Sequence, residues 1–226
     1  MKISFEVKVD IDKDAWNYWH ACNNISHGVD WKERIDLEVQ KHIVDKTQVQ
    51  AFRWLLPYLR KKHKEINLEF VSKQIKDSLK NDFPKVIKKI EEITQKPIYR
   101  DDFTLFLTTL RRSPYNFDQG YIWIYYQSTQ IINTLGHELL HFQFMHYYSK
   151  DVWQKVNGKE WAAIKEGMVV ILNDFLPEWT GVQEKTYPMY RAFAEELLEL
   201  WQGPADRQFD KFVAGAVELV KNHDFN

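Results

Sequence analysis

The residues with the clearest chemical potential are two histidines and a glutamate in the order His-Glu-x-x-His. His137 and His141 are four residues apart, and Glu138 follows the first histidine directly. The surrounding segment, residues 131–144, is apolar and contains no proline, which predicts a buried helix. Residues four apart project from one face of a helix, so the two imidazoles can bind one metal ion. Glu138 points about 100° further around the helix, where it can reach a water on that ion instead of the ion itself.

The same pattern has a simpler interpretation, because two histidines four apart can form an ordinary core pair and the motif also arises by chance. Context favours a metal site, since burying two histidines and a glutamate among leucines without partners would cost free energy. We therefore expect a hydrolytic zinc site, which needs three protein ligands and one open position.

Two glutamates compete for the third ligand position. Glu160 would lie in the first turn of the next helix, where the helix dipole stabilises a carboxylate without any metal. Glu166 lies inside that helix, and its neighbours three and four positions away are alanines and valines. A carboxylate in such surroundings is costly to bury unless it meets a cation, so we favour Glu166. The two glutamates are six residues apart, so we do not expect them to share the site.

The elements expected before the motif mix strands and helices. Alternating apolar residues predict a strand over residues 3–11, and a helix is expected around residues 16–22. Residues 34–40 carry conflicting signals, because Asp30 and Glu33 resemble a capping box while the apolar residues alternate, and we expect a strand there. Amphipathic stripes predict three further helices, at residues 47–60, 66–80 and 84–95.

Pro57 should bend or interrupt the first of these helices. Strand-favouring residues then occupy 103–110 and 121–126. The second of these strands has two interpretations, which the sequence leaves open. At a sheet edge beside the cleft it would hold an extended peptide by strand addition, whereas as a central strand it would pack on both faces.

Composition limits the classes of function. The 226 residues include 31 Lys and Arg against 32 Asp and Glu, so the net charge of −1 gives no reason to expect nucleic acid or membrane partners. The single cysteine, Cys22, excludes an intramolecular disulfide. His20, Cys22 and His27 could ligate a second metal, but a helix-borne histidine and a buried thiol are favoured because no fourth ligand follows. No signal peptide or membrane-spanning segment is apparent, so we expect a cytoplasmic protein.

The segment His137-Glu138-Leu139-Leu140-His141, followed by Lys165-Glu166-Gly167, resembles the gluzincin zinc metallopeptidases, which include thermolysin-like enzymes and Glu-Gly-containing aminopeptidases. The resemblance covers residues 84 to 201. It implies an α+β, mostly helical zincin-like fold with a small mixed sheet. Residues 84–226 would then form the catalytic domain and residues 1–83 an N-terminal α/β subdomain.

The resemblance also implies that His137, His141 and Glu166 hold Zn²⁺, that Glu138 is the general base, and that the substrate is a peptide or protein. Gln143 stands where the family usually has an apolar residue, and Val170 where thermolysin-like enzymes have an aspartate that orients a histidine ligand. Another acceptor must therefore fix that imidazole.

The family uses a tyrosine or histidine from further along the chain to stabilise the oxyanion, and Tyr187, Tyr190 and His223 are candidates here. For each tyrosine, however, core packing in an amphipathic helix over residues 187–201 is the favoured role. A second class of function stays open: a catalytically inactive zincin-like protein that binds peptides or holds a structural metal. Oligomeric state and substrate sequence have no signature in the chain.

Overall fold

The computed structural model describes residues 3–203 and 207–225. The chain divides into two compact units, the first comprising residues 1–81 and 100–129 and the second residues 82–99 and 130–226. Helices and strands both occur, so the predicted α+β class is confirmed. No helix of the described residues is long and apolar enough to cross a membrane.

A four-stranded mixed sheet forms the centre of the first unit, in the order β1-β4-β6-β5. Its strands are β1 (Ser4–Val9), β4 (Asp102–Thr108), β6 (Tyr121–Tyr125) and β5 (Tyr115–Asn116). β4 pairs in parallel with both β1 and β6, whereas β5 is antiparallel to β6. Residues 103 and 105–108 of β4 are buried, which is typical of an interior strand that is covered on both faces.

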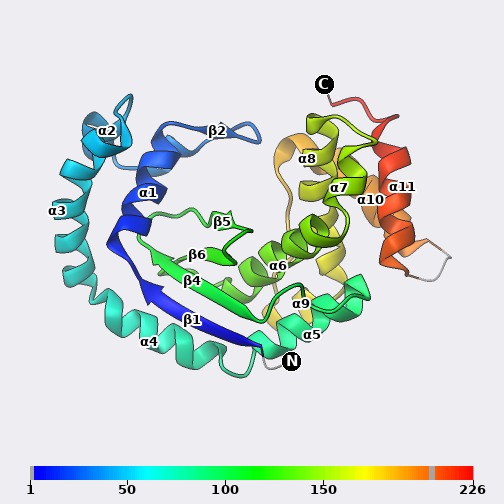
Figure 1. Ribbon diagram of the computed structural model, residues 1–226, viewed down its shortest axis with the longest axis horizontal. Helices are drawn as coiled ribbons and strands as arrows, with labels where there is room; N and C mark the ends of the chain where they lie inside the picture. The colour runs from blue at the N-terminus through cyan, green and yellow to red at the C-terminus, as the bar shows by residue number, and fades with distance from the viewer. Residues whose placement is uncertain (1–2, 204–206, 226) are drawn as a thin grey trace. The chain divides into compact units, whose positions relative to one another are not determined.

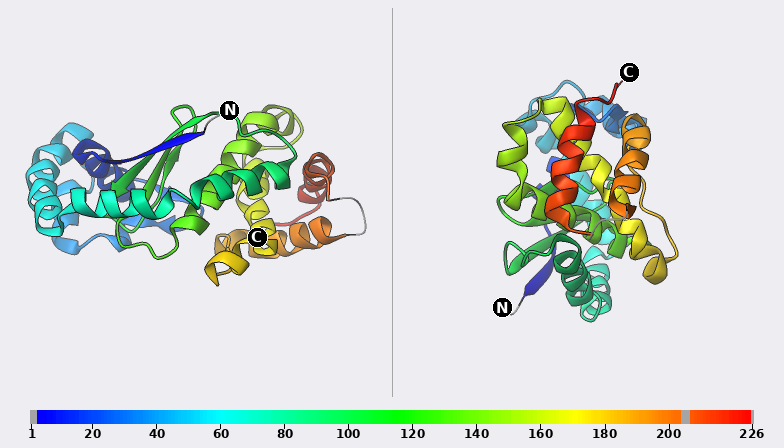
Figure 2. Two further views of the ribbon diagram at one scale, coloured as in Figure 1. Left: turned by 90° about the horizontal axis from the view of Figure 1, so that it is seen from below. Right: turned by 90° about the vertical axis from the view of Figure 1, so that its right-hand side faces the viewer.

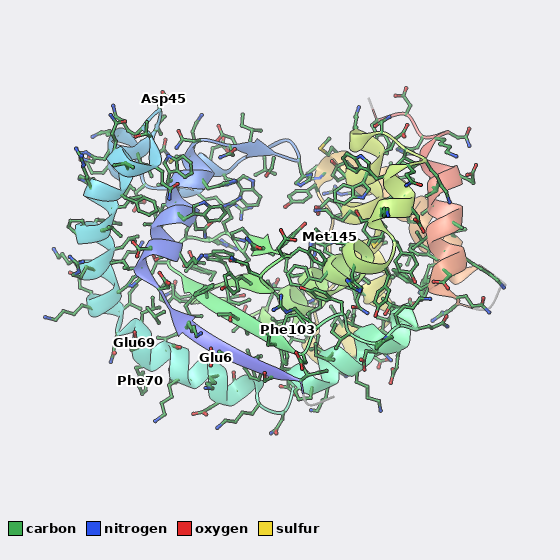
Figure 3. The ribbon with its side chains drawn as sticks, viewed as in Figure 1. Glu6, Asp45, Glu69, Phe70, Phe103 and Met145 are labelled. Carbon is green, nitrogen blue, oxygen red and sulfur yellow. The ribbon has the colours of Figure 1, made fainter. Side chains whose placement is uncertain are left out.

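Helices account for most of the rest of the first unit. They are α1 (Ile11–Cys22), the 3-10 helix η1 (Trp31–Arg34), α2 (Leu37–Ile43), α3 (Gln48–Ile66) and α4 (Leu68–Leu79), with a small ribbon of β2 (Ile25–Ser26) and β3 (Val29–Asp30). α1 packs on α3 and β4, and α4 runs along β1 (Figure 1). Phe70 projects outward from α4 (Figure 3), where it is 55% exposed.

The strand predicted over residues 34–40 is wrong, because η1 and α2 occupy this region. Trp31, Ile35, Val39 and Ile43 are all buried, whereas Leu37 is 76% exposed. The helical spacing of four therefore outweighs the alternation that the prediction relied on.

Pro57 does not interrupt its helix, since α3 continues from Gln48–Ile66 with the proline inside. The missing amide hydrogen leaves one carbonyl of the preceding turn without its helical donor. Both Pro57 and Arg53, which carries that carbonyl, are exposed, so solvent can satisfy it.

Of the two interpretations of residues 121–126, the central strand is the one observed. β6 pairs with β4 on one side and with β5 on the other at Tyr121 and Ile122. Ile122, Trp123 and Ile124 are buried, which matches a strand packed on both faces. Strand addition along this part of β6 is therefore blocked by β5.

The division between units also differs from the predicted boundary near residue 84. Residues 100–129 belong with the first unit, because β4 pairs with β1 along six consecutive residues and β6 pairs with β4. A boundary that cuts the chain at one point cannot take account of pairing between segments that are distant in sequence.

The second unit contains helices and loops but no strand among its described residues. Its elements are α5 (Phe83–Thr94), α6 (Ile131–Tyr147), α7 (Ser149–Trp153), α8 (Gly158–Gly167), η2 (Met168–Asp174), α9 (Leu176–Thr180), η3 (Pro188–Tyr190), α10 (Arg191–Gln202) and α11 (Phe209–Val220). α6 packs against α5, and α8, α10 and α11 pack against one another (Figure 2). The helices predicted over 84–95 and the motif are thus confirmed, and the helix expected over 187–201 begins at Arg191 after η3.

Candidate metal centre

The two histidines and the glutamate of the motif lie together on α6. One ligand atom from each of His137, Glu138 and His141 falls within 4.8 Å of the other two. His141 is 1% exposed and Glu138 is 7% exposed, so the cluster is largely shielded from solvent. Between residues 3–203 and 207–225 it is the single group of three or more histidine, cysteine, aspartate or glutamate residues arranged to hold an ion.

Gln143, one of the two departures from the gluzincin pattern, connects α6 to the segment at the end of α5 through hydrogen bonds. Its side-chain amide donates to Thr94 Oγ1 and to the carbonyl oxygen of Pro97, and its Oε1 accepts from the Tyr99 amide at 3.0 Å. Gln143 is fully buried. A polar residue is tolerated here because it satisfies the backbone of the segment that follows α5.

Glu166 approaches the cluster from α8. Its Oε2 lies 3.4 Å from His141 Nε2, and its side chain is 4% exposed. Two ligand atoms each about 2.1 Å from a tetrahedral ion lie about 3.4 Å apart, which is longer than an ordinary hydrogen bond of about 2.9 Å. The observed separation therefore suits two ligands of one metal.

Glu160, the competing glutamate, has a structural role at the start of the same helix. Its Oε2 accepts from the Asn157 amide at 2.8 Å, while Asn157 Oδ1 accepts from the amide of Glu160. This reciprocal capping box satisfies the helix terminus, as the helix-end interpretation of Glu160 anticipated.

Glu184 is a member of the site that the sequence analysis missed. Its Oε1 lies 2.9 Å from His137 Nδ1, which leaves Nε2 of that imidazole available for a metal. Asn173 holds the segment in place, because its Oδ1 accepts from the Glu184 amide and its Nδ2 donates to the Glu184 carbonyl. Val170, which stands where thermolysin-like enzymes have an aspartate that orients a histidine, lies in η2. Glu184, from the loop that follows, accepts from His137 in its place.

The Glu138 carboxylate has one oxygen that is available to a further hydrogen-bond donor. Its Oε2 is buried and has no hydrogen-bond partner among the described residues. A buried oxygen in this state costs free energy unless something donates to it. With both imidazoles neutral, as metal binding requires, the three carboxylates of Glu138, Glu166 and Glu184 and the ammonium of Lys165, which lies 2.6 Å from Glu166, leave a formal charge of −2 that a divalent cation cancels. The residues present therefore fit a divalent metal.

The pKa values of the two imidazoles move in opposite directions. Burial lowers the pKa of His141, so this imidazole is neutral with a lone pair to offer. Burial also opposes the charged form of His137, but the carboxylate of Glu184 outweighs it and raises the pKa to about 9. His137 would consequently release a proton when Nε2 binds a metal.

The pKa values of the Glu138 and Glu166 carboxylates also move in opposite directions. Burial raises the pKa of Glu138 to about 7. Burial would also raise the pKa of Glu166, but the neighbouring His141 and Lys165 hold it well below its usual range. Glu166 is therefore the ionised carboxylate that a metal ligand must be.

The three candidates for oxyanion stabilisation, Tyr187, Tyr190 and His223, have different environments. Tyr190 is 3% exposed, and burial together with the charge of Glu166 raises its pKa. Its phenol therefore interacts electrostatically with the carboxylate of Glu166. Tyr187 precedes η3, close in sequence to Thr186, whose hydroxyl donates to the Glu166 carbonyl. His223 is instead paired with Glu196 at 2.9 Å and packed between Phe193 and Phe225.

No known family model matches the chain, and no curated protein or solved structure is significantly similar to it. The resemblance to gluzincins therefore rests on the His137-Glu138-His141 cluster, which is compatible with it.

Proposed function

We propose that this protein is a zinc-dependent hydrolase of peptide bonds, with Glu138 as the general base. The observation that carries the proposal is the buried, unpartnered Oε2 of Glu138 beside the imidazoles of His137 and His141. A carboxylate held next to a metal position without an internal donor is suited to take a proton from a water molecule.

His137, His141 and Glu166 would hold the metal. Two imidazoles and one carboxylate form a donor set that zinc uses in hydrolytic sites. When bound, zinc supplies a Lewis acid that activates water near neutral pH and polarises a carbonyl oxygen.

The remaining steps belong to residues of the chain. Glu184 keeps Nδ1 of His137 engaged, so that this imidazole keeps one orientation. Glu138 accepts the proton of the attacking water at Oε2 and then delivers it to the leaving amine. Tyr190 is the candidate for donating to the oxyanion, because it is buried in the same unit and the charge of Glu166 contributes to raising its pKa.

Replacement of Glu138 by Gln tests the proposal. The amide has nearly the same volume but cannot accept the proton, so zinc content and folding should persist while hydrolysis falls by roughly 100- to 10,000-fold. The measurement is mass-spectrometric detection of cleavage in a diverse peptide library, with free and acetylated amino termini to separate aminopeptidase from endopeptidase activity. Zinc should be about one per chain and should be lost in His137→Ala and His141→Ala.

Glu178→Gln is the matched control, because Glu178 is an exposed glutamate of the same unit. It should leave both zinc content and cleavage unchanged. If the wild-type protein holds zinc and binds peptides but cleaves none over a broad pH range, the inactive binding protein becomes the better account.

A further inference from the structure

Lys165 is a buried cation that directly contacts a proposed metal ligand. Its side chain is 7% exposed, and its Nζ lies 2.6 Å from Oε1 of Glu166. The other oxygen of the same carboxylate, Oε2, faces His141 Nε2 at 3.4 Å. The two oxygens of Glu166 are thus divided between an ammonium group and an imidazole.

This contact is not an ordinary consequence of helix geometry. Side chains at successive helix positions diverge by about 100°, so Lys165 and Glu166 would normally point apart. Trp161, one turn earlier, lies 5.6 Å from Lys165 Nζ, and its own Nε1 donates to Ser149 Oγ. The ammonium group is therefore confined between an anchored ring and the carboxylate.

Burying a lysine here is expensive, because the charge loses its hydration and the flexible side chain loses rotamer freedom. An apolar side chain would fill the same space at lower cost. A role at the neighbouring carboxylate accounts for this arrangement better than packing does.

We infer that Lys165 is a positioning residue, which holds Oε1 of Glu166 so that Glu166 meets the metal through Oε2 alone. This inference rests on the proposed zinc site. A carboxylate bound through both oxygens would occupy the position that a hydrolytic zinc keeps open for water and substrate. Lys165 therefore preserves the open position by occupying the second oxygen.

A crystal structure of the zinc-loaded wild-type protein gives the first test. Oε2 of Glu166 should be bound to zinc, with Oε1 still within hydrogen-bonding distance of Lys165 Nζ. Zinc bound through both oxygens, or Lys165 turned away from Oε1, would overturn the inference. Absence of zinc from His137 and His141 would instead overturn the site itself.

The second test uses the visible spectrum of the cobalt-substituted protein, because Co²⁺ absorbs more strongly in four-coordinate than in five-coordinate sites. Lys165→Met keeps the aliphatic stem but frees Oε1, which can then bind the metal as a fifth ligand. The visible absorption of the cobalt-substituted variant should therefore be weaker than that of the wild type, as is typical of five-coordinate Co²⁺. Lys165→Arg, which keeps a cation and donors, should retain the wild-type spectrum.

Lys150→Met is the control for loss of one positive charge, since Lys150 is exposed and lies on α7. Its spectrum should match that of the wild type. A Lys165→Met protein with lower stability but an unchanged cobalt spectrum would show that Lys165 is merely structural. If this variant does not fold, the zinc-loaded wild-type structure decides alone.

Discussion

At the scale of single residues, the candidate metal centre depends on how the imidazole of His137 is oriented. Glu184 contacts His137 Nδ1 at 2.9 Å and is fixed through its backbone by Asn173. Acceptors of this kind set the tautomer and orientation of a metal-binding histidine. The site is thus assembled from three segments: α6, α8 and the loop that contains Glu184.

Removal of the Glu184 carboxylate should weaken zinc binding. We expect Glu184→Ala to lower the zinc affinity by about 10- to 100-fold, because His137 loses the partner that orients Nε2. Competition with a chromogenic chelator measures this affinity. Glu178→Ala, an exposed position on α9, should bind zinc as the wild type does, and equal affinity in both variants would remove Glu184 from the site.

The two glutamates of α8 should respond differently to the same change. Glu166→Gln should lose most bound zinc, because the neutral amide is a poor ligand. Glu160→Gln should retain it, since glutamine can still complete the capping box with Asn157. Zinc content by atomic absorption distinguishes them, and the opposite pattern would transfer the ligand role to Glu160.

At the scale of elements, close packing between α8 and α10 sets where Glu166 lies. Gly167 follows Glu166 directly, and a Cβ added there would lie 2.9 Å from Leu197 Cδ1 and 3.3 Å from Phe193 Cδ1. Leu197 and Phe193 are fully buried, so neither can move aside freely. A glycine at this position therefore lets the two helices approach.

Gly167→Ala should accordingly destabilise the protein by about 1 to 3 kcal/mol through overpacking. Gly158→Ala is the matched control on the same helix, because its Cβ would meet only Trp153 Cη2 at an ordinary 3.6 Å. That change should stay within about 1 kcal/mol of the wild type. Urea denaturation measures both, and equal stability of the two variants would contradict the packing argument.

The sequence predicted the helices and strands that have a strong apolar periodicity. It did not predict features that depend on contacts with residues distant in sequence. The motif helix, α4 and α5 follow from their apolar stripes, and β1 follows from its alternation. α2 was misjudged because its buried residues continue a spacing that starts at Trp31, before the ambiguous segment. Glu184 had no signal at all, since one carboxylate in a loop acquires meaning only when folding brings it to His137.

At the scale of the whole molecule, stability should depend on pH through a histidine far in sequence from the metal motif. Burial and the nearby charge of Arg112 lower the pKa of His20 to about 4. Arg112 Nη2 donates to Nδ1 of His20 at 3.1 Å, which requires a neutral nitrogen. The unfolded chain returns this histidine to a pKa of about 6.5.

Between about pH 6.5 and pH 4 the unfolded state therefore binds more protons than the folded state, so acidification through this window should lower the free energy of unfolding. His20→Gln can still accept from Arg112 but does not titrate, so it should lose less stability than the wild type. Urea denaturation near pH 7 and near pH 4.5 compares them. Equal losses in both proteins would exclude His20 as the source.

The pairing of β1 with β4 has a consequence for how the protein is made. Ser4 is the partner of Asp102, so the first strand leaves the ribosome about 100 residues before the strand it pairs with. At typical synthesis rates that interval lasts roughly 5 to 20 s. During it, β1 is an unpaired strand that could associate with other chains. Its alternate residues include the exposed, oppositely charged Glu6 and Lys8, and such charges discourage aggregation. The charges on the exposed face of β1 thus reduce aggregation of the nascent chain before β4 has been synthesised.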